Sequence, residues 1–108
     1  MKTVADFKRR IAVGVKLHTT NHLAFAGRDE NMKVLYKDED RGIREVSIVQ
    51  STQFALKTEK HDGTFYDSWC TFPKASECRV FGDFITFLDF HTANGISIAY
   101  PCQTYKFV

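Results

Sequence analysis

The clearest fold signal in the chain lies in residues 54–72, FALKTEKHDGTFYDSWCTF. Side chains from Phe54 to Glu59 alternate with the period of two that is typical of a β-strand. The dipeptide Asp62-Gly63 supplies the positive φ angles that a tight hairpin turn requires. The segment therefore predicts two antiparallel strands, 54–60 and 64–72, joined by a tight turn.

Further strands are expected before this hairpin. Residues 44–51 alternate between apolar and polar side chains and predict the strand that precedes it. Residues 27–31 and 37–42 are rich in Gly, Asp, Glu and Arg, and we expect two solvated turns there, on either side of a short strand at 34–36. A period of two also begins near Val13 and predicts the first strand.

More strands are expected after the hairpin. Pro73 favours the first position of a one-turn helix. Residues 78–81 and 84–90 are rich in Phe, Ile and Val, as strands are. Asn94-Gly95 predicts a second tight hairpin. Its returning strand is expected to end or bend at Pro101, before a last short strand that closes the chain.

The first residues predict a short helix. Thr3 is a good N-cap residue, the carboxylate of Asp6 follows three positions on, and apolar residues then repeat at helical spacing. Together these signals indicate a single mainly β (α+β) domain over residues 1–108, with one short N-terminal helix and six to eight strands. We expect a small antiparallel β-barrel or a strongly twisted sheet. An SH3-like barrel is preferred over an OB-like one, because a one-turn helix before the last strands is typical of it.

Composition limits what the protein can be. The chain has 108 residues, with 15 Lys and Arg against 13 Asp and Glu. This length excludes a two-domain enzyme with an interdomain cleft, and the near-balance of charge argues against a strongly basic nucleic-acid coat. Neither a signal peptide nor a spanning helix is predicted, because no apolar stretch is long enough. Three cysteines cannot all pair within one chain, so free thiols and a cytoplasmic location are expected.

No motif for catalysis or metal binding is complete. His18 and His22 are four residues apart, but the general-base Glu of a zinc-protease helix is missing, and we expect a solvent-facing pair on a strand. The cysteines lack a Cys-x₂₋₄-Cys knuckle, and Cys70 is expected to pack in the core. The acidic run 38–42 does not match a calcium loop. The sequence therefore predicts no enzyme, no cofactor and no metal.

Binding is the remaining class of function. Tyr, Trp and Arg are the residues that most often anchor interfaces. The candidates for partner binding are Trp69, Tyr66, Tyr36, Arg28, Arg41 and Arg44. Nucleic-acid binding is the alternative, because residues 1–27 hold five basic residues against one acidic residue. Its candidates are Lys8, Arg9, Arg10 and Lys16.

Residues 44–57, REVSIVQSTQFALK, and residues 67–77, DSWCTFPKASE, resemble small uncharacterised proteins encoded by bacteriophages and other mobile elements of Gram-positive bacteria. The resemblance implies a non-enzymatic module that docks on a macromolecule in the bacterial cytoplasm. The expected partner is a host protein or protein–nucleic-acid complex, for instance a defence nuclease such as a CRISPR effector that the module inhibits. A minor structural or assembly component of a phage particle is a further alternative. We expect a monomer or small homo-oligomer.

Overall fold

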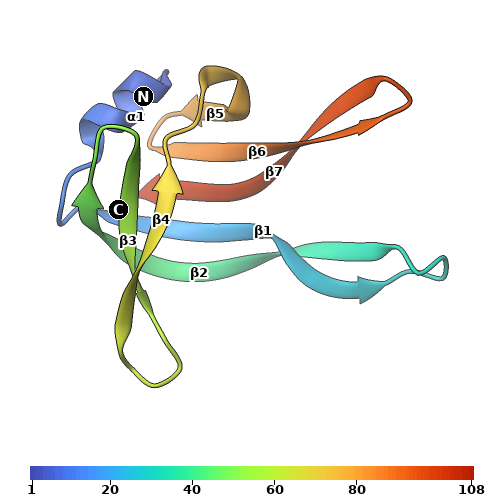
Figure 1. Ribbon diagram of the computed structural model, residues 1–108, viewed down its shortest axis with the longest axis horizontal. Coiled ribbons are helices and arrows are strands. Elements are labelled where there is room, and N and C mark those ends of the chain that lie inside the picture. The colour runs from blue at the N-terminus through green and yellow to red at the C-terminus, as the bar shows by residue number, and fades with distance from the viewer.

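All seven strands of the protein belong to one antiparallel sheet. The computed structural model describes residues 1–108, and the strands follow one another in the order β4-β3-β2-β1-β7-β6-β5 (Figure 1). The predicted N-terminal helix and the number of strands are confirmed, but three of the strands, which were expected to be short, are 12, 13 and 16 residues long. The elements are α1 (Val4–Arg10), β1 (Lys16–Arg28), β2 (Val34–Val49), β3 (Gln53–Glu59), β4 (Phe65–Thr71), the 3₁₀ helix η1 (Ala75–Glu77), β5 (Cys78–Phe81), β6 (Phe84–Ala93) and β7 (Ile96–Phe107).

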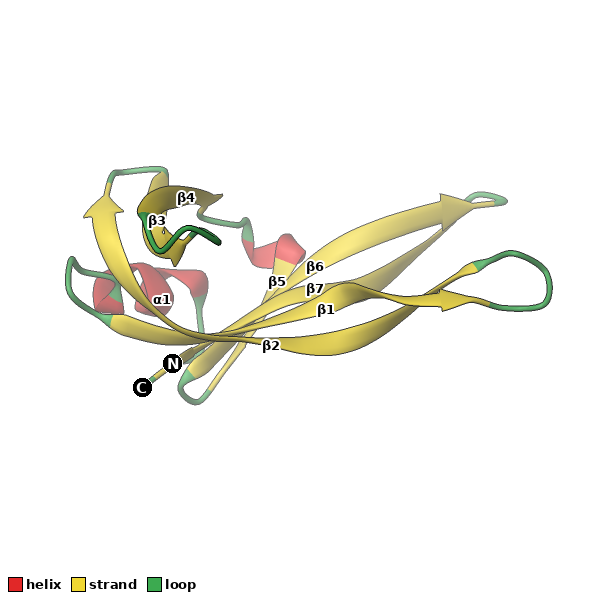
Figure 2. Ribbon diagram, turned by 90° about the horizontal axis from the view of Figure 1, so that it is seen from below, coloured by secondary structure: helices red, strands yellow, loops and turns green.

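The sheet is rolled but not closed. β4 and β5 are its two edges and do not pair with each other. A register shift between Val46 and Ile48 bends β2, and the β3–β4 hairpin then folds back over the rest of the sheet (Figure 2). Of the two forms expected from the sequence, the strongly twisted sheet is therefore the one that forms, and the closed barrel does not.

Helix α1 fills one end of the rolled sheet. The Thr3 hydroxyl accepts a hydrogen bond from the Asp6 amide at 3.2 Å, and the Asp6 carboxylate accepts one from the Thr3 amide at 3.1 Å, so the capping signal in the sequence is confirmed. The fully buried ring of Phe7 meets Phe54 of β3 at 5.9 Å and Phe107 of β7 at 5.7 Å between ring centres. No helix in the protein has the length and apolar character needed to cross a membrane.

The inner face of the rolled sheet changes character along its length. Near α1 it is apolar, and at the far end it is polar, with the buried hydroxyls of Thr19 and Thr58. This gradient leaves the far end able to hold a polar group. The core comprises Phe7, Ile11, Leu17, Val46, Phe54, Leu56, Cys78, Ile85, Tyr105 and Phe107.

Two hairpins extend beyond the rolled part of the sheet. β1 pairs with β7 only over residues 17–21, and past this ladder the β1–β2 hairpin and the β6–β7 hairpin separate (Figure 1). We call residues 24–38 the β1–β2 arm and residues 88–101 the β6–β7 arm. Each arm is a two-stranded antiparallel ribbon, with pairs such as Phe25–Tyr36 and His91–Ile98.

Three local predictions differ from the structure. Residues 37–42, expected as a turn, lie inside β2, because two bulges absorb their turn-like geometry without ending the strand. β7 does not end at Pro101 and no separate last strand follows it, although a register shift beside Leu88 gives the irregularity expected at this proline, which cannot donate a ladder hydrogen bond. The first strand begins at Lys16 rather than near Val13.

Candidate functional site

A bulge in β2 places two arginines on the same side of the sheet. Residues three apart in a regular strand point to opposite faces. Between the pairs His18–Ile43 and Thr20–Asp40, however, the single residue Thr19 faces both Arg41 and Gly42. The extra residue changes the alternation, so Arg41 and Arg44 line one pocket together.

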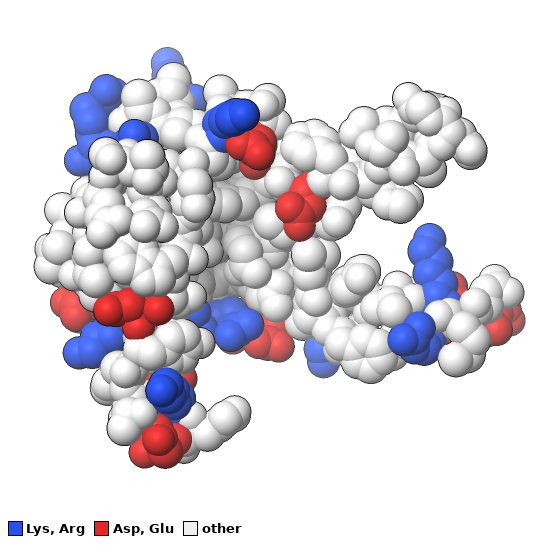
Figure 3. Space-filling model, in the orientation of Figure 1, with Lys and Arg blue, Asp and Glu red and all other residues white.

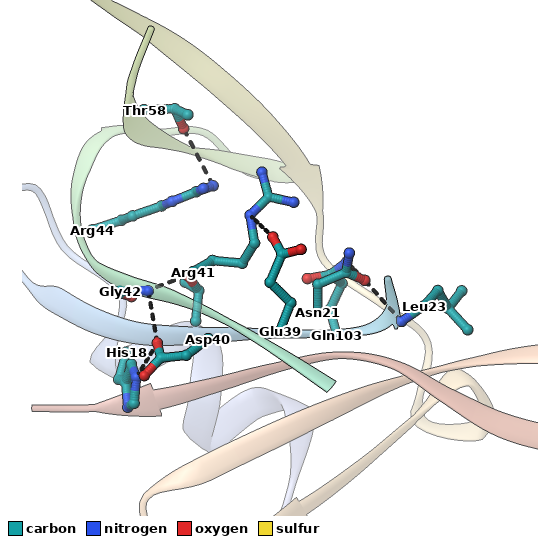
Figure 4. A network of polar contacts seen from close by, with 11 residues as sticks. His18, Asn21, Leu23, Glu39, Asp40, Arg41, Gly42, Arg44, Thr58 and Gln103 are labelled. Atoms are coloured by element: carbon teal, nitrogen blue, oxygen red, sulfur yellow. Dashed lines mark hydrogen bonds and ion pairs between the residues drawn. The ribbon is translucent and has the colours of Figure 1, made fainter. Parts of the chain in front are cut away.

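Polar contacts hold this bulge in place. Gly42 has a φ of +75°, which a glycine adopts without strain. Its amide donates to the Asp40 carboxylate at 2.8 Å, its carbonyl accepts from the Thr19 hydroxyl at 3.1 Å, and His18 Nε2 donates to Asp40 at 2.7 Å (Figure 4). The Gly42 amide, together with His18, keeps the pKa of Asp40 below its usual value.

The pocket beside the bulge is polar and has no carboxylate in its lining. It has a volume of about 220 Å³ and lies at the polar end of the rolled sheet, between Arg41 and Arg44 of β2 and Tyr66 and Ser68 of β4. A larger groove of about 510 Å³ shares both arginines and Tyr66 and continues along the β3–β4 turn. Three of the six predicted partner-binding residues, Arg41, Arg44 and Tyr66, are thus brought together.

Arg44 carries a positive charge that no carboxylate neutralises. It forms no ion pair, and its nearest polar partner is the Thr58 hydroxyl, at a long 3.5 Å from Nη1. Partial burial, and then the neighbouring charge of Arg41, lower the pKa of the Arg44 guanidinium. Arg41 itself has only Glu39, whose carboxylate lies 3.5 Å from Nε (Figure 4).

The other three predicted partner-binding residues lie elsewhere. Trp69 stands opposite Ala55 on the outer face of β4 and is 46% exposed, so it is not a core residue. Tyr36 is 59% exposed on the β1–β2 arm, opposite Phe25. Arg28 is at the tip of that arm, where Nη1 donates to the Met32 carbonyl at 2.9 Å.

The two arms expose large apolar side chains, and Tyr36 is the only one of them that the sequence predicted as a binding residue. Strand alternation identified these residues as apolar, but which strand faces remain uncovered depends on where the arms leave the body. The β6–β7 arm has Asp89 as its only charged residue, and its outer part contains no Lys, Arg, Asp or Glu (Figure 3). The exposed apolar residues are Phe25, Met32, Leu35 and Tyr36 on the β1–β2 arm, and Phe90, Ile96 and Ile98 on the β6–β7 arm.

The basic residues of helix α1 have contacts within the chain. Lys8 Nζ donates to the Ser51 carbonyl at 3.1 Å, Arg9 pairs with Asp6, and the guanidinium of Arg10 lies 4.0 Å from the centre of the Phe107 ring. Lys16 is exposed and borders a shallow pocket with Arg10. The four candidates for nucleic-acid binding are therefore close in space, but three of them are held by other groups.

The histidines and cysteines are not gathered into a metal-binding cluster. The expectation that His22 faces solvent is wrong: its side chain is only 18% exposed, and Nδ1 bonds to Asp38 and Nε2 to Thr104, each at 2.7 Å. No group of three or more His, Cys, Asp or Glu side chains could hold a metal ion. All three cysteines are free, and burial raises the pKa of each thiol, that of Cys70 to about 11.

The chain matches no family model, no curated protein and no solved structure. Three features of its surface are candidates for binding. These are the pocket beside the β2 bulge, the two apolar arms and the basic helix.

Proposed function

We propose that the protein is a non-enzymatic binding module that docks on a protein partner through its two arms. The observation that carries this proposal is the exposure of aromatic and aliphatic side chains on both ribbons, outside the core. Apolar side chains gathered on a projecting element mark an interaction surface, and aromatic residues are enriched at such surfaces. Phe25 and Tyr36 supply a cross-strand aromatic pair on one arm, and Ile96 and Ile98 an aliphatic pair on the other.

A protein partner suits these arms better than a nucleic acid does. Binding to a phosphate backbone needs Lys or Arg side chains directed at it. The β6–β7 arm has none, and the β1–β2 arm balances Arg28, Lys33 and Lys37 with three acidic residues. The uncharged outer part of the β6–β7 arm and the exposed apolar side chains of the β1–β2 arm match instead the dry centre of a protein–protein interface.

Within this proposal the partner is a host protein or protein–nucleic-acid complex in the cytoplasm of a bacterial host cell. Support comes from the resemblance of residues 44–57 and 67–77 to proteins of phages and mobile elements, and from three free cysteines. In this proposal, docking inhibits the partner, for example a defence nuclease such as a CRISPR effector.

The rolled part of the sheet is, in this proposal, of the SH3-like rather than the OB-like kind. Support comes from η1, a one-turn helix that precedes the last three strands. The open edges at β4 and β5 make it an incomplete version of either barrel.

A pair of isoleucines allows a matched test. Ile98 on the β6–β7 arm is 61% exposed, and Ile43 outside the arms is 60% exposed. The wild-type chain, Ile98→Ser and Ile43→Ser are each used to capture partners from nuclease-treated and untreated host lysate, and the captured protein is then titrated in purified form. We expect Ile98→Ser to weaken binding about tenfold and Ile43→Ser to leave it unchanged. Equal affinities for the three chains would contradict a role of the arm.

Nuclease treatment separates the nucleic-acid alternative from this proposal. If capture depends on intact nucleic acid, falls steeply with salt and is lost on charge reversal at Lys8, Arg9, Arg10 and Lys16, the basic helix is the interface instead. A structural or assembly role predicts high-order oligomers in gel filtration, whereas the binding module is expected to elute as a monomer or small homo-oligomer.

A further inference from the structure

The pocket beside the β2 bulge has the chemistry of an anion site. Two guanidinium groups rise on the same side of β2, those of Arg41 and Arg44, with Thr58 on the strand above them (Figure 4). Like charges held together in a partly buried place raise the free energy of the empty site. An anion bound between the two guanidinium groups offsets this repulsion, and the relief of repulsion contributes to the free energy of anion binding.

Hydrogen-bond donors complete the site. The hydroxyls of Tyr66 and Ser68 line the pocket and have no hydrogen-bond partner within the chain. Arg44 uses one N–H, in its long contact with Thr58, and its remaining N–H groups are free. Arg41 keeps its terminal N–H groups, because only Nε faces Glu39. The donors therefore come from two strands, β2 and β4, which the rolled sheet brings face to face.

We propose that this pocket binds the phosphate group of a small phosphate monoester. The three terminal oxygens of a phosphate monoester point in different directions and can accept from donors on both β2 and β4, whereas the two oxygens of a carboxylate lie in one plane. Arginine also presents its N–H groups in a fork that fits phosphate oxygens in pairs. The buried Tyr105 phenol forms part of the same lining, and burial raises its pKa, so it remains a neutral donor rather than a repelling anion.

The neighbouring groove leaves room for the organic part of the ligand. It shares Arg41, Arg44 and Tyr66 with the pocket and continues past Thr58 along residues 59–62, where two carboxylates also line it, so the uncharged part of the ligand fits there better than a second anionic group. Tyr66 is 45% exposed, and Lys60 Nζ lies over its ring, 5.8 Å from the centre. A flexible lysine side chain can move aside for an aromatic group that stacks on this ring. A nucleoside monophosphate combines a phosphate with such a group, and it is the probe that the geometry favours. No residue of either arm lines this pocket. A test of phosphate binding is therefore independent of a test of docking through the arms.

Titration with three probes tests the proposal. Inorganic phosphate, adenosine monophosphate and adenosine are added to the full chain at low ionic strength, and binding is followed by calorimetry and by amide NMR shifts around Ser68. We expect the monophosphate to bind at least tenfold more tightly than adenosine, with inorganic phosphate competing for the same site. Absence of binding by both phosphate probes at millimolar concentration overturns the proposal.

A matched pair of arginine variants provides a second test. Arg44→Gln removes the unpaired charge, while Arg28→Gln removes an exposed arginine at the tip of the β1–β2 arm. We expect Arg44→Gln to lose about tenfold or more in affinity for the monophosphate, and Arg28→Gln to behave as wild type. Because Arg44 is unpaired, Arg44→Gln should keep the Tm of the free protein, while losing the increase in Tm that the monophosphate gives wild type. Equal affinity in the two variants contradicts the site.

A last comparison distinguishes the source of the phosphate. A short single-stranded oligonucleotide carries phosphodiesters of the same charge type along a chain. If it binds through Arg44 at least a hundredfold more tightly than the monophosphate, the pocket belongs to a nucleic-acid interface, and the small-molecule assignment is wrong. Comparable or weaker binding of the oligonucleotide supports the phosphate monoester.

Discussion

The Cys70 thiol of β4 lies 3.8 Å from the phenolic oxygen of Tyr105 on β7. These two strands are not hydrogen-bonded neighbours in the sheet, so the contact crosses the interior of the roll. Burial raises the pKa of Cys70 to about 11 and raises that of Tyr105 well above its ordinary value. The pair therefore remains uncharged at neutral pH, and both groups stay compatible with the core beside them.

The raised pKa predicts a slow-reacting thiol. Only the thiolate reacts with an alkylating reagent, and at pH 8 its fraction at Cys70 is far smaller than in an unfolded chain. We expect iodoacetamide to modify Cys70 at least tenfold more slowly in the native protein than in denaturant, as measured by mass spectrometry of peptides. Equal rates in the two states would show that the thiol is not shielded.

The same shift predicts a loss of stability in alkali. Between pH 9 and 11 the Cys70 thiol ionises in the unfolded chain but not in the folded one, so the unfolded state binds fewer protons and the free energy of unfolding falls as pH rises. The loss from Cys70 is on the order of 2 kcal/mol by pH 11. Urea unfolding at several pH values measures it. Cys70→Ala should flatten the dependence, and an unchanged slope in that variant would sink the assignment.

Two phenylalanines provide a matched test of the core. Phe54 is fully buried against Phe7, whereas Phe25 is 63% exposed on the β1–β2 arm. We expect Phe54→Ala to lower the free energy of unfolding by about 3–5 kcal/mol, through lost burial and a new cavity. Phe25→Ala should change it by less than about 0.5 kcal/mol. Denaturant unfolding of both variants decides, and similar losses would mean that the arm is part of the core.

The positive φ of Gly42 in the β2 bulge predicts how substitutions at this position change the stability of the protein. A Cβ at this position meets no atom within 4 Å, so the cost of a side chain there is the strain of the positive φ alone. We expect Gly42→Ala to lower the free energy of unfolding by about 1–2 kcal/mol. Gly42→Asn should cost less, because Asn tolerates this backbone conformation. If Ala and Asn prove equally costly, the bulge conformation is not the cause.

Acid should weaken the cap of helix α1. The amide N–H groups of Lys2 and Thr3 hold the pKa of Asp6 below its ordinary value of 3.8. A lowered carboxylate pKa contributes stability that is present above pH 3.8 and is lost as pH falls through the folded-state pKa. We expect the Tm of wild type to fall more steeply between pH 5 and 2.5 than that of Asp6→Asn. Parallel curves for the two chains would remove Asp6 as a contributor.

Local signals in the sequence predicted much of the fold. The hairpins at Asp62-Gly63 and Asn94-Gly95, the Thr3 cap and a one-turn helix after Pro73 are confirmed, because each depends on a few neighbouring residues. Two details were wrong: Gly63 has a positive φ but Asp62 does not, and the one-turn helix begins at Ala75 rather than at Pro73. The turn expected at residues 37–42 is wrong, although Asp40 does accept from the Gly42 amide as in a turn. A bulge and a turn share this local chemistry, and the long-range pairing with β1 decides between them.

The candidate site was only partly predictable. Tyr66, Arg41 and Arg44 were chosen as residue types that anchor interfaces, and the structure brings them together. Their common pocket could not be foreseen, since it requires both the altered alternation in β2 and the folding of β4 over β7. The exposure of Ile96 and Ile98 was also hidden, because an alternating pattern does not reveal whether a strand face is covered.

The ladder that joins the two long hairpins has only five residue pairs, from Leu17–Phe107 to Asn21–Gln103. The two arms beyond this ladder can be lengthened or shortened at their tips by whole residue pairs without disturbing a contact in the core. We therefore expect the length of the arms to have little effect on the free energy of unfolding of the protein. Deleting whole residue pairs from the tip of either arm should leave the Tm of the protein unchanged. It should shorten the distance over which the arm can contact a partner.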